Sequence, residues 1–234
     1  MTYRKPPARS LDGNSRPYPR SQDEGGDRGD RGDRRDYGDR DDGTPTQKKY
    51  EDFAWELDFL PHGYVDDPRP MHLRDSIVQV LGDHYFSLLE VIIDREKSAN
   101  FKFEPGRRVF IGKGDQNVIG HRFKRIGYER LTINAKAELP HILEKIVSAD
   151  PVRFLTFFNK SQPITTKMHQ LELLPGIGKK TMWQIIDARK KKNFATFAEI
   201  TERTGISKPE IIFVKRILKE LENPDEKYLL FVRH

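Results

Sequence analysis

The sequence predicts an α+β protein in which a small β-barrel precedes an all-α domain, with a disordered tail at the N-terminus. Residues 1–50 contain almost nothing apolar, and residues 71–134 contain short apolar runs separated by turn residues. From residue 135 onward, apolar residues instead recur at helical spacing. We therefore expect a tail at residues 1–50, a barrel at residues 51–134 and a helical domain at residues 135–234.

The expected tail repeats Gly, Asp and Arg in the stretch GGDRGDRGDRRDYGDRDDG. Residues 1–50 carry 12 Lys and Arg against 10 Asp and Glu, so the tail is close to self-neutralising. Such a composition cannot bury enough apolar surface to fold. Arginine- and glycine-rich tails can contact RNA through charge and guanidinium stacking, whereas the interleaved aspartates favour a solubilising spacer. Both interpretations of the tail remain open.

Residues 51–134 are expected to form the barrel. The segment from Phe53 to Tyr64 is rich in aromatic residues and should pack against the core that follows it. Gly82 and Asp83 separate two apolar runs, which predicts a β-hairpin. Five short strands in about 65 residues suit a small closed barrel of the oligonucleotide-binding (OB) type, although an SH3-like barrel would give a similar pattern. The expected strands are Ile77–Leu81, Tyr85–Ile93, Arg108–Ile111 and two more within residues 117–133.

The helical domain begins with an apolar stripe formed by Leu139, Ile142, Leu143, Ile146 and Val147. Asp150 followed by Pro151 predicts the start of the next helix, because aspartate is a common N-cap and proline is favoured in the first turn. Residues 135–234 carry 18 Lys and Arg against 12 Asp and Glu, a net charge of +6. A basic domain attracts polyanions, but an ordinary lysine-rich helix surface would have the same composition.

The stretch LLPGIGKK, residues 173–180, predicts a tight hairpin between two helices. Gly176 and Gly178 permit positive φ and close approach of the backbone, and Ile177 can turn toward the core. The exposed amides would then lie at a helix N-terminus, where an anion is favoured. Lys179 and Lys180 oppose the helix dipole there, which indicates a role other than helix stability. The apolar stripe consists of Met168, Leu171 and Leu174 before the turn and Met182, Ile185 and Ile186 after it.

An internal echo accompanies this hairpin. The stretch TGISK at residues 204–208 repeats PGIGK at residues 175–179, at an offset of 29 residues. Ser207 replaces the second glycine, so we expect the second copy to be mainly structural. Capping boxes are expected at Thr196 with Glu199 and at Ser207 with Glu210.

The run from Leu174 to Lys179 resembles the hairpin of the helix-hairpin-helix (HhH) family. That resemblance implies binding to nucleic-acid backbones without reading sequence, through the hairpin amides and nearby basic side chains. HhH motifs often form pseudo-twofold pairs, and residues 166–221 would be such a pair. A helical turn used for protein contact is the alternative. The residues expected to bind are Pro175, Gly176, Ile177, Gly178, Lys179 and Lys180, with Arg189, Lys190, Lys191 and Lys192 extending the basic patch or simply favouring a helix C-terminus.

Residues 51–234 as a whole resemble an archaeal family of uncharacterised proteins that joins an OB-like barrel to a C-terminal HhH pair. The stretches that carry this resemblance are PGRRVFIG, RIGYERLT, AKAELP and LELLPGIGKK. The resemblance implies nucleic-acid binding, with RNA favoured over DNA, and no known catalysis.

Several other classes of function are disfavoured. Some HhH proteins are DNA glycosylases with a catalytic aspartate downstream of the hairpin, but Asp187 lies inside a predicted helix and the next aspartate is Asp225. The chain has no cysteine, and its seven histidines lack metal-ligand spacing, so we expect no metal and no cofactor. No apolar run approaches the roughly 20 residues of a membrane span. The N-terminus lacks the apolar core of a signal peptide, so we expect a cytoplasmic protein without membrane contact.

These expectations together describe a non-enzymatic, non-sequence-specific nucleic-acid-binding protein whose partner is the RNA or DNA backbone. Aromatic side chains of the barrel could stack on bases, although each also suits the core. The alternatives are an accessory protein of the ribosome or another ribonucleoprotein, and a DNA repair or processing protein. The candidate stacking residues are Tyr85, Phe86, Phe110 and Tyr128.

Overall fold

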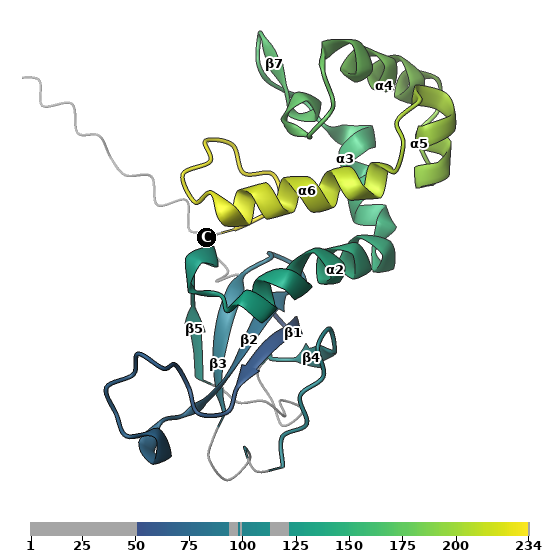
Figure 1. Cartoon of the computed structure of the whole chain (residues 1–234). Helices are drawn as coiled ribbons and strands as arrows, with labels where there is room; N and C mark the ends of the chain where they lie inside the picture. Colours follow the sequence, from purple (N-terminus) through teal and green to yellow (C-terminus); the bar gives the residue numbers. More distant parts are fainter. Residues whose placement is uncertain (1–50, 94–97, 99, 113–121, 234) are drawn as a thin grey trace, which may run out of the picture. The chain divides into compact units, whose positions relative to one another are not determined.

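The structure is a computed structural model that describes residues 51–93, 98, 100–112 and 122–233. It confirms the predicted mixture of strands and helices. Within the described residues, an antiparallel sheet of five strands is followed along the chain by five α-helices (Figure 1). The tail predicted at residues 1–50 lies outside them. No helix in the described ranges is long and apolar enough to cross a membrane.

The five strands have the order β4-β1-β2-β3-β5, and every neighbouring pair is antiparallel. The β2–β3 pair is the hairpin that Gly82 and Asp83 predict, with Val78 opposite Val91. The strands are β1 (Phe53–Leu60), β2 (Ser76–Gly82), β3 (Leu88–Ile93), β4 (Arg108–Phe110) and β5 (Arg122–Arg125).

The closed barrel predicted from the sequence is not formed by the described strands. β4 and β5 lie at opposite edges of the sheet and do not pair with each other. They contain only three and four residues, so they offer few backbone groups for a closing ladder. Two strands are predicted within residues 117–133. Residues 122–133 contain only β5, because Tyr128–Arg130 form a 3-10 turn (η2).

The apolar pattern of the sequence does not identify β1 as a strand, and the strand register shows why. A register shift between Glu56 and Asp58 interrupts the pairing of β1 with β2. Ala54 and Glu56 are buried at alternate positions, but the neighbouring Leu57 is buried as well. The two-residue alternation that marks a half-buried strand is therefore lost.

Two hydrophobic clusters pack against the sheet. The smaller one contains alternate residues of β2 and β3, such as Val78 and Val91. The larger one takes the other alternate positions, including Leu81, and continues into the helices through Leu139. The boundary predicted between residues 134 and 135 therefore runs through one shared core.

The helical residues follow local signals closely. α2 (Ile133–Ala149) buries the entire predicted stripe, and the Thr132 side chain caps the helix by accepting a hydrogen bond from Ala135 N at 3.0 Å. α3 (Pro151–Lys160) begins as predicted, because Asp150 accepts from Arg153 N. The remaining strands are β6 (Pro163–Thr165) and β7 (Met168–His169), and the remaining 3-10 turns are η1 (Met71–Leu73), between β1 and β2, and η3 (Gln170–Leu173), after β7. The remaining helices are α4 (Lys179–Lys191), α5 (Phe197–Thr204) and α6 (Pro209–Glu222).

Candidate functional site

The first turn, residues 174–178, connects η3 to α4 and has the geometry that its glycines predict. Gly176 has a φ of 82°, in the left-handed region. Ile177 is only 4% exposed, and its amide donates to the carbonyl oxygen of Leu174 at 3.1 Å. The isoleucine thus anchors the turn in the core, while Gly176 and Gly178 on either side of it are exposed.

The N-terminus of α4 is open and uncapped. Gly178 is the N-cap residue, and no side chain accepts a hydrogen bond from the first turn. The first backbone bond of the helix runs from Met182 N to Gly178 O, so the amides of residues 178–181 have no acceptor among the described residues. That turn contains no acidic residue, whereas Lys179 and Lys180 are both exposed. Amide dipoles and ammonium charges therefore act in the same direction there.

The space outside the turn is also free of other parts of the described chain. A Cβ atom added at Gly176 or at Gly178 would meet no atom within 4 Å. The positive φ of Gly176 explains its glycine, but Gly178 has a φ of −89°, which other residues adopt readily. Nothing in the described fold requires glycine at position 178, and its absent side chain leaves the α4 amides accessible.

The arm that precedes this turn is shorter than predicted. The helix expected through Met168 and Leu171 is instead the two-residue strand β7 followed by the single 3-10 turn η3. The imidazole Nδ1 of His169 accepts from Leu171 N at 3.1 Å, and the Glu172 carboxylate accepts from His169 N at 2.8 Å. This capping box makes residue 170 the first helical position. Pro175 then disfavours helical backbone at the residue before it, so a longer helix cannot form.

The second turn, residues 205–208, repeats the glycine conformation and the buried isoleucine of the first one, but Lys208 has a φ of 49° where the matching Lys179 is already helical. Gly205 has a φ of 75°, and Ile206 is buried in the same relative position as Ile177. The predicted capping box at Ser207 and Glu210 is wrong, because Lys208 is the N-cap residue and makes no side-chain cap bond. Pro209 forces this difference, since proline excludes right-handed helical backbone from the residue before it.

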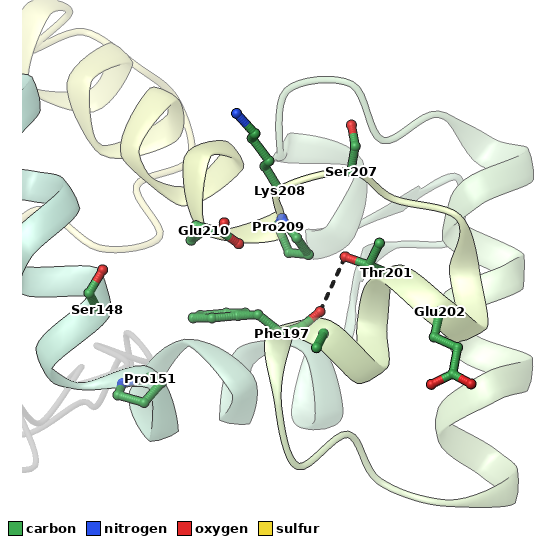
Figure 2. A pocket seen from close by; sticks show the side chains of 10 residues that line it. Ser148, Pro151, Phe197, Thr201, Glu202, Ser207, Lys208, Pro209 and Glu210 are labelled. Carbon is green, nitrogen blue, oxygen red and sulfur yellow. Dashed lines mark hydrogen bonds between the residues drawn. The ribbon is translucent and has the colours of Figure 1, made fainter.

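The surroundings of the second turn suit an anion less well. An open groove of about 810 Å³ lies beside it, between α5 and the α2–α3 corner. Figure 2 shows Phe197 projecting from α5 toward Ser148 and Pro151. The groove is lined by Glu202 and Glu210 as well as Lys208, whereas the first turn of α4 has no carboxylate. The repeat therefore leaves residues 174–180 as the more electropositive of the two turns.

The basic run at the end of α4 divides into two kinds of residue. The Arg189 guanidinium donates to the Phe158 carbonyl, at 2.8 Å, and to both oxygens of Ser161, at 2.8 and 2.9 Å. Burial lowers its pKa. Arg189 thus fastens α4 to the end of α3. The side chains of Lys190, Lys191 and Lys192 are exposed, with Lys190 at 3.6 Å from Asp187 and Lys192 at 3.4 Å from Glu199.

Trp183 is a candidate that the sequence interpretation does not include. Its side chain is 57% exposed on α4, four residues after Lys179, so the two lie on the same helix face. The buried face of α4 is formed by Met182, Ile185 and Ile186. A large aromatic residue outside that stripe was the available signal, and one aromatic on a helix surface is too common to identify a site alone.

The candidate stacking residues of the sheet are less accessible. Phe86 is completely buried in the larger core. Phe110 packs edge-on against Phe53, with ring centroids 5.3 Å apart. Tyr85 and Tyr128 are partly buried. Among the residues that the structure describes, no group of three or more His, Cys, Asp or Glu side chains could hold a metal ion.

Comparison with known proteins identifies the family to which this molecule belongs. Residues 50–233 match a family model described as protein of unknown function, DUF655. The chain belongs to the DUF655 family. The uncharacterised protein MJ0038 of Methanocaldococcus jannaschii is 45% identical over 187 residues, which cover 80% of this chain and 82% of that protein. A crystal structure of the DUF655 protein Af1531 from Archaeoglobus fulgidus has 46% sequence identity and a TM-score of 0.70. That match covers 78% of this chain and 100% of the other. Both relatives are archaeal.

Proposed function

We propose that this DUF655 protein binds nucleic-acid backbone without sequence specificity, and that its preferred partner is RNA. The observation that carries the proposal is the open N-terminus of α4. Its first-turn amides lack acceptors among the described residues, and two exposed lysines follow its N-cap residue. That N-cap is Gly178, where an added Cβ atom would meet no atom within 4 Å. A phosphate group satisfies the amides and neutralises both lysines at once.

Trp183 extends this contact to a base. A phosphate at the first turn of α4 would leave the adjoining nucleotide close to the exposed indole on the same helix face. Bases stack on aromatic rings with little regard to sequence, and they are available for stacking where a strand is unpaired. Because recognition of RNA mostly involves unpaired loops and ends, this arrangement favours RNA with single-stranded segments over duplex DNA.

The repeated turn geometry supports the HhH interpretation of residues 166–221. Gly176 and Gly205 share positive φ, and the isoleucine after each glycine is buried. We propose that these turns form an HhH pair in which the first copy binds phosphate and the second is structural. Arg189 is left out of the phosphate contacts because its donors are engaged with α3. Lys190, Lys191 and Lys192 are available to contact a longer strand.

The strand order supports a relation of the sheet to an OB barrel. Consecutive strands β1, β2 and β3 are neighbours, β4 lies beside β1, and β5 lies beside β3. We propose that the sheet is an OB-type arrangement that is open between β4 and β5. The role proposed for the whole molecule is binding without catalysis, and an accessory role in a ribonucleoprotein such as the ribosome would use the same phosphate contact.

Trp183 also allows the proposed binding to be measured by tryptophan fluorescence. The chain has two tryptophans, so a Trp55→Phe variant reports on Trp183 alone. We expect single-stranded RNA to quench its emission, with an affinity that falls steeply as salt is raised. Duplex DNA should bind more weakly and quench less. Unchanged emission at an RNA concentration that saturates the protein in filter binding would remove Trp183 from the interface. The absence of RNA and DNA binding at low salt would contradict the proposed function itself.

A further inference from the structure

A second basic surface, which is concave, lies outside the first turn and the N-terminus of α4. It is an open groove of about 350 Å³, here called the Arg153 groove, formed by parts of the chain that are distant in sequence. The turn between β2 and β3 contributes His84 and Tyr85, α3 contributes Arg153 and Lys160, and the C-terminal segment contributes Arg233. The fold thus brings together cations that no short sequence motif would link.

The charge of this groove is one-sided. Its lining contains Arg153, Lys160, Arg233 and the titratable His84, and it contains no carboxylate. None of the three permanent cations forms an ion pair with a carboxylate of the described residues. A fourth cation lies alongside, because the Arg125 guanidinium donates to the Arg233 carbonyl at 3.0 Å. Like charges gathered in a concavity concentrate the field and attract an anion.

Arg153 is the least exposed of the three permanent cations. Its guanidinium is half-buried and lies over the Phe86 ring, 4.6 Å from the centroid. Its two terminal nitrogens donate to the main-chain carbonyls of Asp83 and His84. Burial lowers the pKa of this group. The carboxylates of Asp150, Glu51 and Asp83 act on this charge, but none of them forms an ion pair with it. Because the guanidinium is partly desolvated, an incoming anion interacts with it more strongly than with an exposed arginine.

The walls of the groove are fixed before any ligand arrives. The Glu51 carboxylate accepts hydrogen bonds from the amides of His84, Tyr85 and Ser87 at 2.9, 2.8 and 3.2 Å, which holds the β2–β3 turn. The Arg233 amide donates to the Tyr85 carbonyl at 3.1 Å, which holds the C-terminal segment against that turn. A preformed site loses little conformational entropy on binding.

The groove and the first turn are also close along the chain. Gln170 lines the groove and is the first residue of η3, whose last residue is Leu173. The seven residues from Gln170 to Gly176 are joined by six Cα-to-Cα steps, which can span at most roughly 20 Å. A single strand of about six nucleotides is long enough to reach both places, even if its phosphates advance by only the roughly 3.4 Å per nucleotide of a duplex strand.

We propose that the Arg153 groove is a second phosphate-binding site, which takes a nucleotide phosphate between Arg153, Lys160 and Arg233 with the attached base beside Tyr85. This proposal rests on the proposed function, because it assigns the groove to the strand that the hairpin holds. A free mononucleotide presents the same phosphate and base, so it is the other source of this chemistry.

The test uses the full chain with Lys160→Gln and Arg233→Gln combined. Both side chains are exposed, so the fold should tolerate these changes, and Arg153 is left in place because it supports the β2–β3 turn. A matched double variant, Lys145→Gln with Lys215→Gln, removes the same charge from exposed positions outside the groove. Circular dichroism and thermal melting establish that each variant is folded.

We expect the groove variant to bind a single-stranded RNA of about 12 nucleotides roughly tenfold more weakly than the matched variant, with a salt slope lower by between about 1 and 2. Adenosine monophosphate, titrated by NMR, distinguishes the two sources. If adenosine monophosphate binds the wild-type protein but not the groove variant, the groove also takes free nucleotides. If adenosine monophosphate does not bind the wild-type protein, the groove takes only the phosphates of a strand.

Equal RNA affinity and equal salt slope in the two folded double variants would overturn the groove proposal. The phosphate contact proposed at the N-terminus of α4 is tested separately, because a Gly178→Asp change leaves all groove residues intact. RNA binding that survives Gly178→Asp but falls in the groove variant would support the groove and contradict the hairpin. The reverse pattern would support the hairpin and overturn the groove.

Discussion

Arg216 and Glu220 form an ion pair of 2.7 Å between side chains that are 1% and 0% exposed. Arg216 also donates to the carbonyl of Leu173 at 3.2 Å, one residue before the first turn begins. Glu220 accepts from three successive amides of the C-terminal segment, Leu230 to Val232, at 2.9 to 3.0 Å. One buried pair on α6 therefore positions both the entrance of the hairpin and the segment that carries Arg233.

Replacing Arg216 with methionine should destabilise the protein strongly. The Glu220 carboxylate would stay buried without its cation, and breaking such a pair from one side typically costs about 3–5 kcal/mol. Urea denaturation followed by circular dichroism measures the loss. Lys215→Met, at an exposed position on the same helix, is the control and should change the free energy of unfolding by less than about 0.5 kcal/mol. A similar small loss for Arg216→Met would show that the pair does not organise this part of the fold.

The pair also shows what the sequence can and cannot reveal. Arg216 and Glu220 are four residues apart, so in the sequence they look like an ordinary surface pair on a helix. Their burial depends on the C-terminal segment folding back over α6, which no local pattern indicates. The stripe of α2, the Asp150 cap and the positive φ of Gly176 could be predicted because each depends on a few adjacent residues.

The wrong prediction of a closed barrel and the failure to predict β1 also come from features that no local pattern shows. The open sheet depends on how far β4 and β5 extend, and the register shift in β1 hides its alternation. Within the candidate site, the turn glycines and lysines could be identified from sequence. The inward orientation of Arg189 and the assembly of the Arg153 groove require side chains from several elements to meet.

The stability of the first arm should depend on pH through His169. Its Nδ1 must be unprotonated to accept from Leu171 N, and burial, followed by the charge of Arg189, keeps its pKa below the ordinary value of 6.5. The unfolded chain therefore binds a proton at the His169 imidazole more readily than the folded chain does. The stabilising contribution of the neutral imidazole is complete above pH 6.5 and declines as the pH falls below that value.

Thermal melting at about pH 7.5 and about pH 5.5 measures this effect. His169→Asn keeps an acceptor at the cap but does not titrate, so its melting temperature should fall less over the same interval. Because the two proteins differ only at position 169, the difference between their pH dependences reports on that residue. An identical pH dependence in the two proteins would mean that His169 does not contribute.

Lys179 and Lys180 should contribute to RNA affinity chiefly through phosphate contacts. We expect Lys179→Ala combined with Lys180→Ala to weaken binding similarly for RNAs of different sequence. The slope of log affinity against log salt should fall by between about 1 and 2. Lys145→Ala, on the exposed face of α2, should leave the slope unchanged. A loss that differs widely between RNA sequences would indicate base recognition instead.

A Gly178→Asp substitution tests whether the N-terminus of α4 holds a phosphate. Aspartate is a favourable N-cap residue, and the open space at Gly178 accommodates its side chain, so helix stability should be kept or slightly raised. The same carboxylate would occupy the α4 amides and repel a phosphate. Gly178→Ala tests the added side chain without charge, and Thr196→Asp adds the same charge at the exposed N-cap of α5.

Binding of single-stranded RNA and the melting temperature should be measured together on these variants. We expect Gly178→Asp to keep or exceed the wild-type melting temperature and to bind RNA at least about tenfold more weakly, a loss of about 1.4 kcal/mol. Thr196→Asp should stay near wild-type affinity, and Gly178→Ala should lose less affinity than Gly178→Asp because it adds bulk without charge. A folded Gly178→Asp protein with wild-type RNA affinity and salt slope would show that the N-terminus of α4 does not hold a phosphate.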